Sequence, residues 1–390
     1  MKEKFEHNHA IDSLEESIFL TIGQKAIEYK ALNLSQGFPD FNFHEKILDT
    51  ITQCAKENVH QYAPPRGHIQ LRNNLSNLIS QRYKHSFNSM EEILICAGAT
   101  QGIFITLLAL LNEKDKVLLF SPFYDSYLAS IRLAKATPLE FPLDLENPME
   151  SINFNRLEEF LKVHRPKMIV FNNPHNPSGI CFSKSQLLHL LQLATKYDCY
   201  LLSDEVYEYL TYDGFQHIPL YTLNSNNFEK LITISSAGKT FGYTGHKIGW
   251  VLSNSEIISH LLKVHQYNVF CVNTPFQWAY AQVLEEKSFT AYVKAFQLLY
   301  QEKRDYIIKI LEQKNCQILK PLGSYFILVK IPTQFNNSFE YCLKLLEEKK
   351  LASIPISSFY LDKKTANQEY IRLCFAKKEE TLKALENIEF

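Results

Sequence analysis

The 390-residue sequence lacks the features that mark several specialised classes of protein. Its eight cysteines are scattered and form no C-x-x-C pair, which argues against a disulfide framework and against a zinc site. No window approaches the run of about 18 apolar residues that a membrane-spanning helix needs. The N-terminus carries acids and histidines where a signal peptide has an apolar core. We therefore expect a cytoplasmic protein with no bound metal.

The charge balance also excludes some partners. A formal net charge of -1 gives no electrostatic reason to expect a nucleic acid or an anionic membrane as partner. Apolar residues make up 46% and charged residues 21%, which is ordinary for a soluble globular enzyme. Tryptophan is scarce, with two residues, but 27 Phe and 21 Tyr suffice for a core and for an aromatic pocket. No internal repeat or low-complexity segment is present.

From Glu92 onward, short apolar runs alternate with helical patterns. This rhythm predicts a mostly parallel mixed sheet with helices on both faces, in an α/β fold. The last third reads differently, with a long amphipathic helix over 288–314 followed by strands and a final helix. We expect a large domain at 45–285 and a smaller α+β domain formed by 1–44 and 286–390. The predicted strands of the large domain are 93–96, 117–120, 168–171, 199–202, 231–234 and 247–253.

Polar and glycine-rich residues repeatedly follow these predicted strands. In open α/β sheets, ligands bind at the carboxyl ends of the strands. We therefore expect residues that are far apart in the sequence to converge at one edge of the sheet, namely Gly98, Tyr124, Asn176, Asp204 and Lys239.

The segment Ser235 to Trp250, SSAGKTFGYTGHKIGW, carries the most specific chemical signal. Lys239 follows a predicted strand and stands among small residues, so a ligand can approach its amine closely. Lysine condenses with aldehydes when its pKa is lowered by burial or by nearby cations. Ser236 and Lys247 would suit a phosphate, and together these residues suit pyridoxal phosphate. A single Ser-x-x-Lys, however, is most often a solvated surface feature.

Five segments carry a resemblance to a known family: SDEVYEYLTYDG, SSAGKTF with TGHKIGW, NNPHNPSG, NLSQGFPDF and IRLCFAKKEETL. They resemble the class I and II aminotransferases, which are fold-type I enzymes that use pyridoxal phosphate. The chain is most similar to the methionine and kynurenine (glutamine transaminase K-like) branch. The resemblance extends from Leu34 to Leu382 and implies a homodimer whose active site is shared between the subunits.

The resemblance assigns the catalytic residues. Lys239 matches the lysine that forms a Schiff base with the cofactor and then moves the Cα proton of the substrate. Asp204 matches the aspartate that pairs with the protonated pyridine nitrogen, although an aspartate after a strand can also simply cap a helix. Tyr207 and Asn176 match the pair that binds the 3′-oxygen of the ring.

The resemblance also assigns a phosphate site. Ala99 and Thr100 lie where a strand turns into a helix, so their backbone N–H groups favour an anion. Ser236 would add a hydroxyl group and Lys247 a positive charge, at a position where many relatives have arginine. Tyr62 matches a tyrosine that reaches the phosphate from the partner subunit.

Two further residues match the contacts on the two faces of the pyridine ring. Tyr124 matches the aromatic side chain that stacks on the ring, and Val206 matches the apolar contact on the opposite face. Without the resemblance, an aromatic residue in a PFY turn would most often belong to the core.

The substrate side of the site is implied in the same way. Arg372 matches the arginine that binds the substrate carboxylate bidentately, together with Asn176. Gly37 matches a glycine whose amide contacts the same carboxylate. Phe19 and Phe270 fall where the family places aromatic residues of the side-chain pocket. By itself, an arginine in a strand would indicate only a salt bridge.

The resemblance implies an aminotransferase that moves the amino group of methionine, aromatic (including kynurenine-like) or glutamine-like amino acids to a 2-oxo acid. A cysteine-conjugate β-lyase is the nearest alternative, because pyridoxal phosphate activates Cα in both reactions. Formation of pyruvate and ammonia would distinguish elimination from transfer. A transcription regulator built on this fold is disfavoured, because too few residues precede Asn33 for a winged-helix module.

Overall fold

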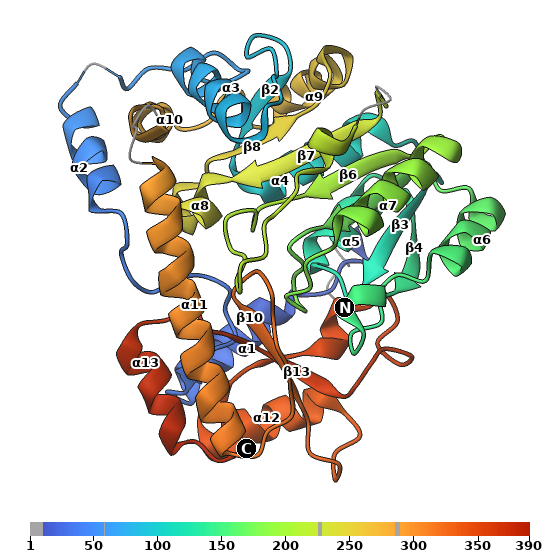
Figure 1. The fold of residues 1–390 in the computed structure, drawn as a ribbon, viewed down its shortest axis with the longest axis vertical. Coiled ribbons are helices and arrows are strands. Elements are labelled where there is room, and N and C mark those ends of the chain that lie inside the picture. Colours follow the sequence, from blue (N-terminus) through green and yellow to red (C-terminus); the bar gives the residue numbers. More distant parts are fainter. Residues whose placement is uncertain (1–10, 58, 225–227, 285–288) are drawn as a thin grey trace, which may run out of the picture.

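The computed structural model, which describes residues 11–57, 59–224, 228–284 and 289–390, is organised around two large sheets, beside which β1 and β11 form a two-stranded sheet. The larger sheet has seven strands, and only β8 runs antiparallel to its neighbours (Figure 1). This confirms the predicted mixed, mostly parallel sheet. In spatial order the strands are β2 (Ile93–Cys96), β8 (Gly249–Leu252), β7 (Leu231–Ser236), β6 (Tyr200–Asp204), β5 (Met168–Asn172), β3 (Lys116–Ser121) and β4 (Thr137–Pro142).

The central strands are apolar throughout because both of their faces are covered. In β5, Met168 and Val170 belong to one buried cluster, whereas Ile169 and Phe171 belong to the other. This alternation follows from the two-residue period of a strand. One cluster includes residues of α4 (Gly98–Leu110), α5 (Asp125–Leu133) and α9 (Ser255–Asn268). The other includes residues of α3 (Ile69–Tyr83), α6 (Phe154–His164), α7 (Lys184–Lys196) and α10 (Thr274–Leu284), and α2 (Glu45–Cys54) packs against α10.

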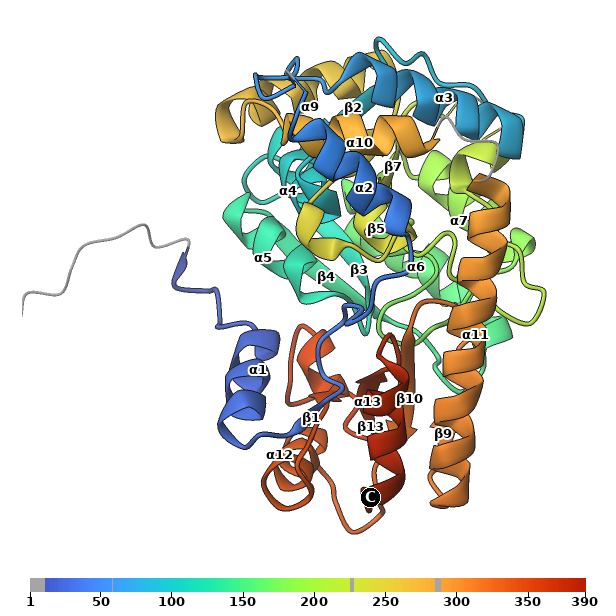
Figure 2. The same cartoon turned by 90° about the vertical axis from the view of Figure 1, so that its left-hand side faces the viewer.

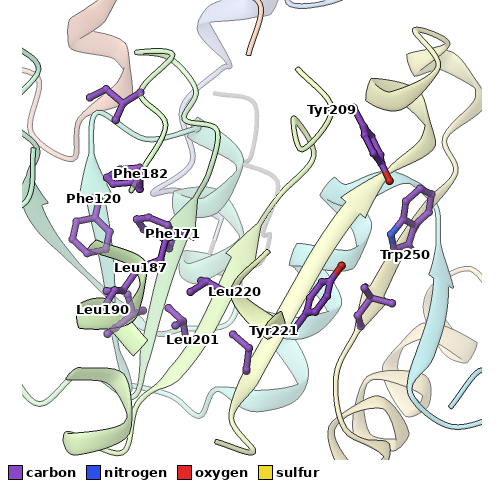
Figure 3. Packing of buried hydrophobic residues seen from close by; sticks show 14 of the residues in the cluster. Phe120, Phe171, Phe182, Leu187, Leu190, Leu201, Tyr209, Leu220, Tyr221 and Trp250 are labelled. Carbon is purple, nitrogen blue, oxygen red and sulfur yellow. The ribbon is translucent and has the colours of Figure 1, made fainter. Parts of the chain in front are cut away.

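Aromatic packing holds the strands at the centre of the sheet to their covering layer. The rings of Phe120 and Phe171 lie 5.7 Å apart between centroids, and those of Phe171 and Phe182 lie 4.6 Å apart (Figure 3). All three side chains are buried. Burial of one such side chain stabilises the folded state by roughly 1.5–3 kcal/mol. The cluster therefore stabilises the strands whose ends carry the polar residues.

The C-terminal third forms a second layer around a four-stranded antiparallel sheet of order β12-β13-β10-β9 (Figure 2). The N-terminal segment joins it, because β1 pairs in parallel with β11. The domain limits at 44/45 and 285/286 stay a prediction, and residues 1–10 and 286–288 of the smaller part lie outside the described residues. The elements are α1 (Ile18–Glu28), β1 (Leu32–Asn33), α11 (Phe289–Gln313), β9 (Ile318–Leu319), β10 (Phe326–Lys330), α12 (Ser338–Lys349), β11 (Leu351–Ala352), β12 (Ile354–Pro355), β13 (Tyr370–Cys374) and α13 (Glu379–Ala384).

The sequence-based expectations omit several elements, among them β4, α6 and α12. The segment TPLEFP of β4 contains two prolines, which an edge strand tolerates because only one of its sides is paired. The strand expected at 247–253 begins at Gly249, because Lys247 has a left-handed backbone with φ of 52°. Within the described ranges, no helix combines the length and apolarity needed to cross a membrane.

Candidate active site

A cavity of about 490 Å³ opens where the carboxyl ends of β5, β6 and β7 meet the smaller sheet. The five residues expected to converge, from Gly98 to Lys239, all line it. This confirms the inference that the polar residues after the strands share one edge. The predicted site residues that line the cavity are Phe19, Gly37, Ala99, Thr100, Tyr124, Asn176, Asp204, Val206, Tyr207, Ser236, Lys239, Lys247 and Arg372.

Two predicted site residues, Tyr62 and Phe270, lie away from this cavity. Their side chains contact each other edge to face, with ring centroids 5.3 Å apart. Tyr62 is 81% exposed and Phe270 is 47% exposed. Such an exposed aromatic pair is available to a second subunit. The reach of Tyr62 into a partner's phosphate site and the place of Phe270 in the side-chain pocket both stay predictions.

Lys239 lies at the end of β7, in the short helix α8 (Ala237–Thr240) that the Ser236 side chain caps. Its Nζ atom lies 2.6 Å from the Tyr325 hydroxyl and 3.3 Å from the carbonyl oxygen of Gly37. Burial disfavours the ammonium form and lowers the pKa of Lys239 to about 8. A substantial fraction of the amine is therefore neutral, and hence nucleophilic, in mildly alkaline solution.

Asp204 is the last residue of β6 and is buried. The Tyr127 hydroxyl donates to its Oδ2 atom at 2.6 Å, and the Val206 amide donates to Oδ1 at 3.3 Å. Burial nevertheless raises the pKa of Asp204 to about 6. A buried carboxylate of this kind gains from a cationic partner such as a protonated pyridine nitrogen. Tyr127 is not among the predicted site residues, although it follows Tyr124 by three residues, the spacing of one helix face.

An anion cradle lies at the start of α4. Gly98 has φ of +76°, and a Cβ atom there would come within 3.2 Å of Lys247 Nζ. The ammonium group of Lys247 thus lies against the first turn of this helix, whose backbone N–H groups have no partner within the helix. Ala99, Thr100 and Ser236 line the same cavity. N–H donors, a hydroxyl and a cation together suit a phosphate group.

Arg372 projects from β13 and is buried. Its Nη1 atom donates to Asn176 Oδ1 at 3.0 Å, and its Nη2 atom donates to the Ser35 carbonyl at 2.8 Å. Its Nε atom is buried with no hydrogen-bond partner among the described residues. The guanidinium packs over Phe326 at 3.9 Å and Phe19 at 5.0 Å, and burial lowers the pKa of Arg372 to about 10. An unpaired donor on a buried cation favours a carboxylate ligand.

Two polar residues of the cavity wall were also missed. The Ser17 hydroxyl donates to Asp125 Oδ2 at 2.7 Å, which ties the N-terminal segment to α5. Both side chains line the cavity, and burial raises the pKa of Asp125. Asp125 directly follows Tyr124, but an acid at this position equally indicates one that stabilises a helix N-terminus. No sequence pattern therefore places Asp125 in the site.

These features fit pyridoxal phosphate. The neutral form of Lys239 can react with its aldehyde, and Asp204 can hold its ring nitrogen. The cradle formed by Gly98 and Lys247 can hold its phosphate. In the described part of the chain, no three His, Cys, Asp or Glu side chains gather in a way that could bind a metal ion.

Comparisons with known proteins agree with this geometry. The profile of the family "Aminotransferase class I and II" matches residues 29–388. Human kynurenine–oxoglutarate transaminase 3 is 32% identical over 100% of this chain and 90% of its own length. Methionine aminotransferase of Escherichia coli is 32% identical over 96% of this chain and 95% of its own.

A solved structure is equally similar. The crystal structure of an Escherichia coli protein with methionine aminotransferase function superposes with a TM-score of 0.91. It is 30% identical, and the alignment covers 98% of both chains. Given the match over nearly its whole length, the chain belongs to the class I and II aminotransferases and is a pyridoxal-phosphate-dependent enzyme.

Proposed function

We propose that the enzyme moves the amino group of methionine, aromatic (including kynurenine-like) or glutamine-like amino acids to a 2-oxo acid. The observation that carries this proposal is the wall of the cavity around Arg372. Phe326 and Phe19 contact its guanidinium group, and the Tyr124 ring lies 6.5 Å from that of Phe19. Such a wall favours thioether and aromatic side chains, which gain roughly 1.5–3 kcal/mol from burial.

The charges in the cavity support the same donor class. Among the described residues, its cations are Lys239, Lys247 and Arg372, each with a role elsewhere in the reaction. No further cation is left for a distal carboxylate, and Asp125 in the wall would repel one. Burying an unpaired carboxylate costs several kcal/mol. This cost is large enough to make donors with a distal carboxylate much poorer substrates than methionine or aromatic amino acids. The names of the human and Escherichia coli relatives point to the same donors.

We assign the residue roles as follows. Arg372 binds the carboxylate of the amino acid, with its orientation fixed by Asn176 and by the Ser35 carbonyl. Pyridoxal phosphate, when bound, supplies the aldehyde that links to the donor amine and a protonated ring that accepts the electron pair left at Cα. Lys239 takes the Cα proton onto its neutral amine, because its lowered pKa keeps that form populated.

The remaining residues hold these groups in place. Asp204 keeps the pyridine nitrogen protonated, and Tyr127 holds the Asp204 carboxylate in position. Tyr207 and Asn176 bind the 3′-oxygen, while Tyr124 and Val206 enclose the two faces of the ring. The backbone of Ala99 and Thr100, the Ser236 hydroxyl and Lys247 bind the phosphate. Tyr62, together with Phe270, completes the site of the partner in a homodimer; both rings are exposed in the single chain.

A panel of amino donors tests the proposal. Each donor is mixed with the loaded enzyme in a single turnover, and the conversion of the cofactor to its pyridoxamine form is followed by absorbance. Methionine and aromatic amino acids should convert the cofactor fastest. Release of pyruvate and ammonia from cysteine conjugates, without pyridoxamine formation, would instead identify a β-lyase.

A further inference from the structure

Tyr325 lies directly beside the catalytic lysine. It immediately precedes β10, and only 1% of its surface is exposed. Its hydroxyl oxygen is 2.6 Å from Lys239 Nζ and 2.6 Å from the carbonyl oxygen of Gly37. The same carbonyl lies 3.3 Å from Lys239 Nζ, so the amine, the phenol and the carbonyl form a closed triangle of hydrogen bonds.

The direction of these hydrogen bonds follows from the chemistry of the three groups. A carbonyl oxygen can only accept, so in the contact with Gly37 the Tyr325 hydroxyl is the donor. The Tyr207 side chain is a further hydrogen-bond partner of the same hydroxyl. The phenol oxygen is then left to accept a hydrogen bond from the lysine amine. Lys239 therefore donates N–H groups to two acceptors, and neither acceptor occupies the lone pair of the neutral amine.

We propose that Tyr325 is a positioning residue for Lys239, which holds the free amine by an N–H group so that its lone pair stays available to the Cα proton. The inference rests on the proposed role of Lys239 as the proton-transfer base. It adds a specific task for a side chain that forms no part of the cavity wall. It also links the base to Gly37, whose amide is assigned to the substrate carboxylate.

The surroundings of Tyr325 favour a fixed, neutral phenol. Its ring packs against Tyr207, Phe326 and Tyr300, with centroids 5.2, 4.8 and 6.2 Å away. Burial raises its pKa well above the usual value, so the hydroxyl keeps the proton that it donates to Gly37. A rigid acceptor loses little entropy when it holds a long, flexible lysine side chain.

The test compares two conservative variants of the enzyme loaded with pyridoxal phosphate. Tyr325→Phe removes the hydroxyl group and keeps the ring. Tyr300→Phe makes the same change in the adjacent, fully buried ring and serves as the matched control. For each enzyme we would measure kcat, KM for the best donor of the panel, and the kinetic isotope effect with that donor deuterated at Cα.

We expect Tyr325→Phe to bind the cofactor and to lower kcat about tenfold, the scale of one positioned hydrogen bond. KM should change by less than about twofold, and the isotope effect should rise because proton transfer becomes more rate-limiting. Tyr300→Phe should leave all three quantities near those of the wild type. The proposal is overturned if Tyr325→Phe keeps kcat and the isotope effect, or if both variants lose activity equally.

A negative result with Tyr325→Phe can be distinguished from a failure of the proposed function. The comparison uses whichever donor reacts best, so it does not depend on methionine or aromatic donors being preferred. Whether Lys239 is the base is decided separately, by the rate of Cα proton exchange in a Lys239→Ala variant. If that variant exchanges the proton at the wild-type rate, the role of Lys239 is wrong, whatever Tyr325 does.

Discussion

The Tyr127 hydroxyl donates a 2.6 Å hydrogen bond to Asp204 Oδ2, across 77 residues of sequence. The bond joins the first turn of α5 to the end of β6. It stabilises the ionised carboxylate against the burial that raises the pKa of Asp204 to about 6. The charge of Asp204, which we propose to face the cofactor ring, is therefore stabilised by a residue that is remote in sequence.

Asp204→Asn should bind the cofactor but react slowly, because a neutral amide cannot keep the pyridine nitrogen protonated. We expect a loss in kcat on the order of 10²–10⁴. Tyr127→Phe retains the carboxylate and should lose far less, which makes it the matched control. Asp204→Asn activity within about threefold of the wild type would remove Asp204 from the mechanism.

Borohydride reduction of the loaded enzyme should fix the cofactor covalently on Lys239, because its half-buried amine, with a lowered pKa, is the nucleophile of the cavity. Peptide mapping by mass spectrometry checks the position. Lys247, the second lysine of the cavity, is the internal control and should stay unmodified. A label on Lys247, or on neither residue, would contradict the assignment.

Capture of pyridoxal phosphate by the cofactor-free enzyme should become faster as the pH rises. Lysine is cationic below its pKa and neutral above it, and only the neutral amine attacks an aldehyde. With a pKa of about 8 for Lys239, the rate should climb between roughly pH 7 and 9 and then level off. Stopped-flow absorbance measures it. A rate that is flat over this range would mean that the amine is not the titrating group.

Gly98→Ala should weaken cofactor binding. The added Cβ atom would come within 3.2 Å of Lys247 Nζ and displace the cation from the phosphate cradle. Gly214→Ala is a matched control, because Gly214 has the same φ of +76° and its added Cβ atom meets nothing within 4 Å. Both variants incur the left-handed strain of roughly 1–2 kcal/mol, which thermal unfolding would report.

Titration of the two cofactor-free variants with pyridoxal phosphate then measures the contribution of the phosphate cradle to cofactor binding. We expect the dissociation constant for pyridoxal phosphate to rise at least about threefold for Gly98→Ala and to stay unchanged for Gly214→Ala. Equal affinities in the two variants would show that Lys247 does not contribute to phosphate binding from this position.

Methionine and aromatic donors should exceed aspartate by at least about tenfold in kcat/KM, because a distal carboxylate would be buried without a partner. Arg66 does not line the cavity, and its guanidinium group donates a hydrogen bond to the Glu91 carbonyl. Phe270→Ala should reduce kcat/KM for methionine and phenylalanine more than for alanine. A kcat/KM for aspartate equal to that for methionine would show that a cation does reach the pocket.

The order of apolar runs in the sequence predicted the sheet, and the residues that follow those runs predicted most of the cavity lining. Strands such as β5 are apolar at every position because both faces are buried, and this pattern is visible without coordinates. The polar residues that end each strand, from Gly98 to Lys239, must share one edge of a parallel sheet, so their convergence followed from topology alone. The strand β4 was not predicted, because it lies at the edge of the sheet and pairs on one side only. An edge strand tolerates prolines and does not need the apolar pattern of a central strand.

The side chains that support this cavity could be identified only from the packing of elements that are far apart in the sequence. Tyr127, Asp125 and Tyr325 stand in ordinary helix or strand contexts, and no local pattern distinguishes them from core or capping residues. Their importance depends on distances of 2.6–2.7 Å to atoms far away in the sequence. Such distances are set by how β10 and α5 pack against the larger sheet. A hydrogen bond needs an alignment within a few tenths of an ångström, which residue periodicity does not encode.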